Sequence, residues 1–230
     1  MDQSVLDAVK RWPNVPAVYG WLSLTARGEW KLHPLGDAQA AGGGEGISNT
    51  QILGFIDRNY SEQADGAWFF QNGPQRVYVR LDAAPLIIHV DPTPHLLKTH
   101  HGKIVHQVLH WYCDETGQLY AKTDCGPARV DDRDLQVLAE VLQSPEGLSV
   151  FDLFEQFHEV ECNAQDSLAI QECSTTDTTL FDPLQQYLAL RQPVPLSFVN
   201  AVDIANVLHF IPNPGVTSEH SSALGRKITP

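Results

Sequence analysis

The sequence predicts an α+β protein made of duplicated antiparallel β-hairpin-plus-helix units with an appended α/β C-terminal part. Polar-Gly turns recur between runs of aromatic and β-branched residues, which is typical of antiparallel hairpins. Capped amphipathic segments follow two of these hairpins. A short pattern, G-P-x-R-V, also occurs twice, at residues 73–77 and 126–130. We therefore expect a duplicated domain over residues 1–145, a C-terminal part over 146–212 and a disordered tail over 213–230.

The first unit begins with a short helix and a hairpin. The amphipathic stretch over residues 5–12 ends at Pro13, which cannot continue a helix. Strands are expected at Trp21–Thr25 and Trp30–Leu32, on either side of an Arg-Gly turn. The glycine-rich run at residues 42–46 has the composition of a flexible linker and lacks the Lys-Ser/Thr of a phosphate-binding loop.

A helix and further hairpins follow. Ser48 or Asn49 is expected to cap a helix whose Ile52, Leu53, Phe55 and Ile56 share one face. The expected strands after it are Trp68–Phe70, Arg76–Leu81, Pro85–Val90 and Ile104–Cys113, with a His-rich loop at Thr93–Lys103. In Arg76–Leu81 the apolar residues alternate with Arg76, Tyr78 and Arg80, so Arg76 should face away from the core.

Beyond residue 130 helical patterns dominate. Asp131 and Asp132 are predicted to cap a helix with its apolar stripe at Leu135, Leu138, Val141 and Leu142. The later predictions are helices at Val150–Phe157, Asp182–Leu190 and Val202–Phe210, and strands at Ser167–Cys173 and Leu196–Val199.

Composition limits the class of partner. The formal net charge is −13, and residues 131–182 hold thirteen acidic residues against Arg133, a charge of −12 in that stretch. Such a balance repels nucleic acid and anionic lipid, so we expect neither as a partner, but rather a small ligand or another protein. No apolar run is long enough for a membrane span or a signal peptide, and the four cysteines have no C-x-x-C spacing. A soluble, cytoplasmic protein with reduced thiols is expected.

The motifs also resemble a known family. W-L, then R-G-E-W, the capped helix around Ile52–Ile56, D-G-x-W at residues 65–68, G-P-x-R-V and L-D-A-A-P-L at residues 81–86 occur in this order. They resemble an uncharacterised family of proteobacterial proteins that carry G-x-W, a capped helix, D-G-x-Y, T-P-x-x-K-x-x-I and E-D-A-P-F in the same order. The resemblance covers about residues 18–130. It implies repeated α+β motifs reminiscent of pleckstrin-homology folds and a role in signal transduction.

The repeated turns supply the predicted binding residues. Each G-P-x-R-V turn carries an arginine, Arg76 or Arg129, whose planar fork suits a carboxylate or phosphate. Gln71, Asn72 and Gln75 surround the first turn and offer amide contacts. The alternative is that these residues build the turn and that the arginines pair with surface acids. We expect a non-enzymatic ligand- or protein-binding module, regulatory in character, that needs no cofactor.

Histidines give the alternative function. His95, His100, His101, His106 and His110 fall within a short stretch and offer ligands for zinc or another divalent transition metal. A metal-dependent hydrolase that uses this His95–His110 cluster is therefore the second hypothesis, and a solvated His-rich loop the simpler one. No nucleophile motif is present, and Asp131, Asp132 and Asp134 are explained by the start of a helix, so no catalytic residue is predicted.

Overall fold

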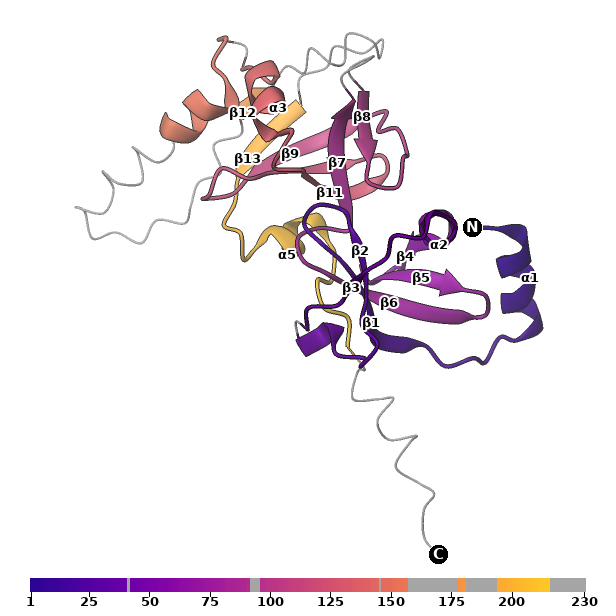
Figure 1. Ribbon diagram of the computed structural model, residues 1–230. Coiled ribbons are helices and arrows are strands. Elements are labelled where there is room, and N and C mark those ends of the chain that lie inside the picture. The colour runs from indigo at the N-terminus through magenta and orange to yellow at the C-terminus, as the bar shows by residue number, and fades with distance from the viewer. Residues whose placement is uncertain (41, 92–95, 145, 157–177, 181–193, 216–230) are drawn as a thin grey trace, which may run out of the picture. The chain divides into compact units, whose positions relative to one another are not determined.

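The computed structural model describes residues 1–40, 42–91, 96–144, 146–156, 178–180 and 194–215. Contacts within the chain group them into two units, which are described separately (Figure 1). Unit 1 comprises residues 1–83 together with the segment from 210 onward, and unit 2 comprises residues 84–209. The domain boundaries expected after residues 145 and 212 stay predictions. Each unit holds one mixed β-sheet with short helices, which confirms the α+β class.

Unit 1 contains a six-stranded sheet in the order β3-β2-β1-β6-β5-β4. Its strands are β1 (Val18–Leu24), β2 (Trp30–Leu32), β3 (Glu45–Gly46), β4 (Tyr60–Glu62), β5 (Trp68–Asn72) and β6 (Gln75–Leu81). The helices are α1 (Gln3–Arg11) and α2 (Thr50–Arg58), with a 3₁₀ turn at Ala38–Ala40. Neighbouring strands pair antiparallel except β1 and β6, which pair in parallel and join the two halves of the sheet.

A bulge interrupts β1 beside β6. Val18 pairs with Val77 and Leu22 with Val79, so four steps along β1 correspond to two along β6. Gly20 lies in this bulge with a φ of 81°, a region that residues with a Cβ rarely adopt. The carbonyl oxygen of Gly36 lies 2.3 Å from where a Cβ on Gly20 would be. Glycine is therefore required both by the backbone angle and by the close approach.

Helix α2 begins as the sequence predicts. The Asn49 side chain accepts hydrogen bonds from the backbone N–H groups of Gln51 and Ile52, which confirms it as the N-cap. The helix is fixed to the sheet by a hydrogen bond from Trp30 Nε1 to Asp57 Oδ1, 2.9 Å long, and by the edge-to-face contact of Phe55 with Phe70.

The opposite face of this sheet carries a second apolar cluster. It consists of Ala67, Phe69 and Tyr78, against which Tyr19 and Ile211 pack. The segment that contains Ile211 is also tied to unit 1 through its backbone, because Ile211 N donates to the Gly66 carbonyl and Leu81 N donates to the Pro212 carbonyl. Residues from the far end of the chain therefore complete unit 1.

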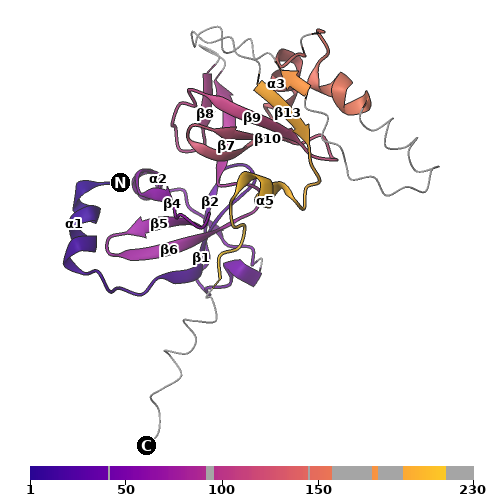
Figure 2. The ribbon, with the colours of Figure 1, turned by 180° about the vertical axis from the view of Figure 1, so that it is seen from behind.

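Unit 2 contains a seven-stranded sheet in the order β12-β13-β9-β10-β11-β7-β8. Figure 2 labels β7, β8, β9, β10 and β13 of this sheet. The strands are β7 (Leu86–Asp91), β8 (Leu96–Thr99), β9 (Val108–Cys113), β10 (Leu119–Thr123), β11 (Gly126–Val130), β12 (Thr178–Leu180) and β13 (Val194–Phe198). Helices α3 (Leu135–Val141) and α5 (Ile204–Leu208) accompany them, and residues 150–156 are also helical. Trp111, Leu119, Leu138 and Leu196 are among the fully buried side chains of this core.

Several sequence expectations in unit 2 change. The His-rich segment contains a strand, β8, where a loop was expected, because Leu97 and Thr99 have partners in β7. Helix α3 begins after Asp134, so Asp131 and Asp132 are not its caps. The predicted elements Ser167–Cys173 and Asp182–Leu190 lie outside the described residues.

The two units share an order of strand pairing. In each, a hairpin is followed by a three-stranded meander whose last strand returns in parallel to the first strand of the hairpin: β6 to β1, and β11 to β7. Both copies of G-P-x-R-V lie where the last meander strand begins. The helices differ, because α2 precedes its meander and α3 follows its own. An internal repeat stays a prediction.

No helix among the described residues is both long enough and apolar enough to cross a lipid bilayer.

Replacing Gly20 with alanine tests the bulge. The new Cβ would meet the Gly36 carbonyl, and the φ of 81° would be strained, so we expect Gly20→Ala to reduce the free energy of unfolding by about 2 kcal/mol or more. Gly43→Ala is the matched control, because a Cβ on Gly43 would have no atom within 4 Å. Urea titration of both variants measures the effect; equal stabilities would show that the bulge adapts.

Candidate functional site

A pocket of about 910 Å³ lies in unit 1 between α2 and one face of the sheet. Its walls come from β1, β2, β3, β5 and β6, from α2, and from the connection between β3 and α2. Most of the lining is apolar, with Leu22, Phe55, Phe70 and Val77 forming part of it. This volume and this lining are those of sites that bind small organic molecules.

Large apolar side chains stay exposed around the pocket. Trp21 is 44% exposed, Leu32 43% and Ile52 49%, and all three line it. Ile52 belongs to the apolar stripe of α2, of which Ile56 is buried against the sheet. The sheet therefore covers part of the apolar stripe of α2, at Ile56. The part that the sheet does not cover, at Ile52, forms one wall of the pocket. Apolar groups that gather in this way on a protein surface mark binding sites more often than scattered ones.

Apart from Glu45, the polar side chains that line the pocket are uncharged. Ser48, Gln51, Asn72 and Gln75 contribute hydroxyl and amide groups to the lining. Among the described residues that line the pocket, Glu45 is the one ionisable side chain. A ligand held here would meet apolar walls and uncharged hydrogen-bonding groups.

The predicted binding residues fall in different places. Asn72 and Gln75 line the pocket, and Gln75 Nε2 also donates to the Pro16 carbonyl. Gln71 is buried and donates its Nε2 to the Gly73 carbonyl, so it stabilises the turn. Strand alternation directs Arg76 to the other face of the sheet, where its guanidinium lies 4.6 Å from the ring centre of Phe69 and donates to Gln63.

Arg129 belongs to unit 2, whereas Arg76 belongs to unit 1. The Arg129 Nη2 group donates to Gln118 Oε1 at 2.7 Å and to Asp132 Oδ1 at 2.6 Å, and its side chain is mostly buried. Gln118 in turn donates to the Val130 carbonyl. Arg129 therefore joins a hydrogen-bonded network within unit 2, and its role in binding stays a prediction.

Among the described residues, the predicted ligands His100, His101 and His106 lie in the connection between β8 and β9, and His110 lies in β9. The rings of His100 and His101 are neighbours, with centroids 4.9 Å apart. His106 is exposed, and His110 Nε2 shares a hydrogen bond with Ser197 Oγ at 2.8 Å. His95 lies outside the described residues. Metal binding by these five residues stays a prediction.

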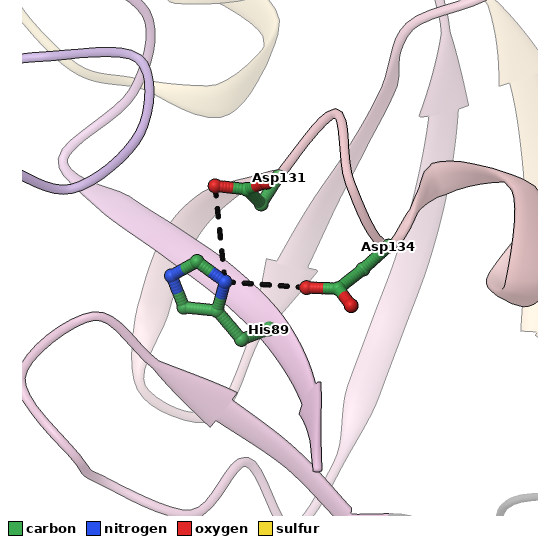
Figure 3. Close-up of side chains that lie close together, drawn as sticks. All are labelled: His89, Asp131 and Asp134. Carbon is green, nitrogen blue, oxygen red and sulfur yellow. Dashed lines mark hydrogen bonds and ion pairs between the residues drawn. The ribbon is translucent and has the colours of Figure 1, made fainter. Parts of the chain in front are cut away.

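A different group brings titratable side chains together in unit 2. His89 Nδ1 lies 3.2 Å from Asp134 Oδ2 and 3.8 Å from Asp131 Oδ2 (Figure 3). Arg133 donates to both oxygens of Asp131 and holds the pKa of that carboxyl at about 2. Sequence reasoning noted Asp131 and Asp134 but missed His89, because a parallel strand pair between β7 and β11 brings them together. The charge and spacing of Asp131 and Asp134 were the signal in the sequence from which this group could have been found.

Unit 1 holds a Ser–His–Asp arrangement in its core. Ser23 Oγ and His33 Nε2 share a hydrogen bond of 2.8 Å, and His33 Nδ1 lies 3.5 Å from Asp37 Oδ1. The same three residue types activate a serine nucleophile in hydrolases. Here Ser23 and His33 are both 0% exposed, so no substrate can reach the hydroxyl. We interpret the group as a buried polar network that joins β1 to the segment after β2.

Cysteine chemistry is also disfavoured at Cys113. The side chain is buried, and loss of solvation raises the pKa of its thiol to about 12. The thiolate that nucleophilic catalysis requires is therefore scarce at neutral pH.

Comparison with known proteins places this chain in a family. A family model, DUF2944, described as "Protein of unknown function (DUF2946)", matches residues 1–214. The chain belongs to the DUF2944 family. No curated protein matches this DUF2944 member in a sequence search.

Two solved structures are similar to parts of the DUF2944 chain. A DUF1285 family protein from Silicibacter pomeroyi DSS-3 is 16% identical, with a TM-score of 0.40 over 59% of this chain and 76% of that one. A DUF1285 family protein from Shewanella baltica OS155 is 17% identical, with a TM-score of 0.36 over 50% of this chain and 87% of that one.

The two arginines of the repeated turns should differ in their effect on stability. Arg129→Ala leaves the buried Gln118 oxygen and Asp132 without this donor, so we expect a loss of about 1–3 kcal/mol in the free energy of unfolding. Arg76→Ala removes an exposed side chain and should cost about 0–1 kcal/mol. Thermal and urea unfolding of the two variants measure this difference, and equal losses would contradict it.

Acid should destabilise unit 2 through two histidines. Burial of the ring nitrogens lowers the pKa of His100 well below its usual value and that of His101 from 6.5 to about 4. The unfolded chain therefore binds more protons than the folded one between these values, so stability is full above about pH 6.5 and falls as the pH drops toward 4. We expect an unfolding temperature at least about 5 °C lower at pH 4.5 than at pH 7.

Variants separate this effect from the titration of carboxylates. His101→Gln removes one of the two groups, so the decrease between pH 7 and pH 4.5 should become smaller. His106→Gln changes an exposed ring and should leave the decrease as in the unsubstituted chain. An identical pH dependence for all three proteins would mean that the buried histidines do not govern acid stability.

Proposed function

We propose that the protein is a non-enzymatic binding module and that unit 1 holds a small, largely apolar, uncharged ligand in the pocket beneath α2. The observation that carries this proposal is the pocket itself, about 910 Å³ in volume and lined by exposed apolar side chains. It is built on a helix and a sheet rather than on loops alone, so its walls hold their positions without a ligand.

The lining decides the chemistry of the ligand. Trp21, Leu32 and Ile52 would each bury apolar area against a bound molecule, and burial stabilises a complex by about 25 cal/mol per Å². Asn72 and Gln75 would orient the ligand by hydrogen bonds from their amides. A charged ligand would lose solvation in this pocket without gaining an ionic partner of opposite sign, apart from a cation near Glu45.

A regulatory role fits a module of this kind. A ligand that binds without reacting stays chemically unchanged, but it alters the stability of the protein or its preference for partners. Ligand sensors act in this way. The family resemblance found from the sequence implies a part in signal transduction and a relationship to pleckstrin-homology folds. We include the part in signal transduction and the relationship to pleckstrin-homology folds in the proposal.

An uncharged fluorescent probe tests the pocket. N-phenyl-1-naphthylamine brightens in apolar surroundings, and we expect it to bind the full chain saturably with one site per molecule. Ile52→Glu places a carboxylate on the pocket wall and should weaken binding at least about tenfold, or about 1.4 kcal/mol. Leu6→Glu is the matched control, because Leu6 is also an exposed residue of a helix in unit 1 but does not line the pocket.

Probe binding by the two variants distinguishes a ligand pocket from a surface that binds another protein. Loss of binding in Ile52→Glu with retention in Leu6→Glu supports the pocket. Equal binding by both variants, or a signal that rises without saturation, contradicts it and would favour the view that α2 offers a surface for another protein. Circular dichroism of each variant confirms that the fold is retained.

A further inference from the structure

The group formed by His89, Asp131 and Asp134 has the spacing of a metal site. One ligand atom from each residue lies within 4.8 Å of the other two, and the His89–Asp134 pair is 3.2 Å apart. Ligand atoms at about 2.0–2.2 Å from one zinc ion are separated from each other by about 3–3.5 Å. The His89–Asp131 distance of 3.8 Å needs to shorten by only a few tenths of an ångström. Figure 3 shows His89 Nδ1 directed toward both carboxylates.

The backbone fixes the three residues before any ion binds. Asp131 N donates to the Ile88 carbonyl at 2.9 Å, which extends the pairing of β7 with β11 by one residue. Asp134 N donates to the Asp131 carbonyl at 3.0 Å, which sets the turn into α3. Because these bonds place Asp131 directly after β11, beside β7, and Asp134 in the turn that follows, binding would cost little conformational entropy.

The orientation of Asp131 is set by Arg133. The backbone N and Nε of Arg133 donate to Oδ1, and Nη2 donates to Oδ2. Each carboxylate oxygen has a further lone pair, so Oδ2 can still face His89 and an ion. Hydrogen bonds of this kind to a ligating carboxylate are common in metal sites, where they orient the ligand. The Arg133 side chain is 66% exposed, so water screens much of its repulsion of a cation.

Exposure and charge also suit an ion. With a neutral imidazole, the two carboxylates and the guanidinium have a total charge of −1. This negative charge attracts a divalent cation. Asp131 is fully buried, while the side chains of His89 and Asp134 are 30% and 23% exposed. Three protein ligands at a partly open position leave room for a water molecule, as in zinc sites that keep one coordination position open.

We propose that His89, Asp131 and Asp134 bind a divalent transition-metal ion of the zinc type, in unit 2 and separate from the apolar pocket of unit 1. The imidazole nitrogen selects zinc over magnesium and calcium, which prefer oxygen ligands. The site differs from the predicted histidine cluster in all of its ligands. The alternative is an ion pair between a protonated His89 and the two carboxylates, which would have no affinity for zinc.

Titration calorimetry of the chelator-treated full chain with zinc chloride tests the proposal. We expect one site per chain in the micromolar range, with 10 mM magnesium unable to displace the metal. Asp134→Asn and His89→Gln should each weaken zinc binding at least about tenfold. Asp132→Asn is the matched control: Asp132 is close in sequence but pairs with Arg129 and is outside the group. His101→Gln, a change in the predicted histidine cluster, should also retain zinc.

Unfolding temperatures without zinc verify that each variant folds, and a zinc-induced rise in that temperature gives a second readout. Loss in Asp134→Asn and His89→Gln, with retention in the two controls, supports the site. Absence of zinc binding in the unsubstituted chain, equal affinity in all variants, loss in His101→Gln alone, or displacement by magnesium each overturns the proposal.

Discussion

The parallel pairing of β1 with β6 is the constraint on which unit 1 depends. It joins the hairpin β1–β2 to the meander β4–β5–β6, and only the joined sheet offers a face broad enough to receive α2. The bulge at Gly20 adapts the two strands to each other and changes the direction of the residues that follow it. Trp21 then lines the pocket with much of its ring exposed, so backbone geometry and the candidate ligand site are parts of one arrangement.

Local features of the chain were predictable. Asn49 and the Ile52–Ile56 stripe define α2, and the alternation in Arg76–Leu81 correctly separates Val77 and Val79 from Arg76, because caps and periodicity act between near neighbours. The parallel pairings were not predictable, because they join segments separated by long connections that carry no turn motif. His89 meets Asp131 through such a pairing, and the pocket appears only once β1, β5 and α2 are placed together.

The glycine-rich run shows how composition can suggest the wrong physical cause. Its residues have the composition of a linker, yet a Cβ on Gly42 would lie 2.3 Å from Asp37 Oδ2 and one on Gly44 would lie 2.7 Å from the His33 ring. At Gly42 and Gly44 the backbone therefore passes close to a buried histidine and its carboxylate neighbour, which leaves little room for a side chain. Glu45 and Gly46 then pair with β2 as a short strand, so the end of the run is part of the sheet.

The return of Ile211 and Pro212 to unit 1 has a consequence for biosynthesis. The ribosome makes residues 1–83 first, but the segment that bonds to Gly66 and Leu81 emerges only after the whole of unit 2 has been translated. At about 5–20 residues per second, this delay is on the order of ten seconds. During that interval Phe69 and Tyr78 lack their Ile211 contact, so the nascent chain exposes part of this apolar face to chaperones and to neighbouring chains.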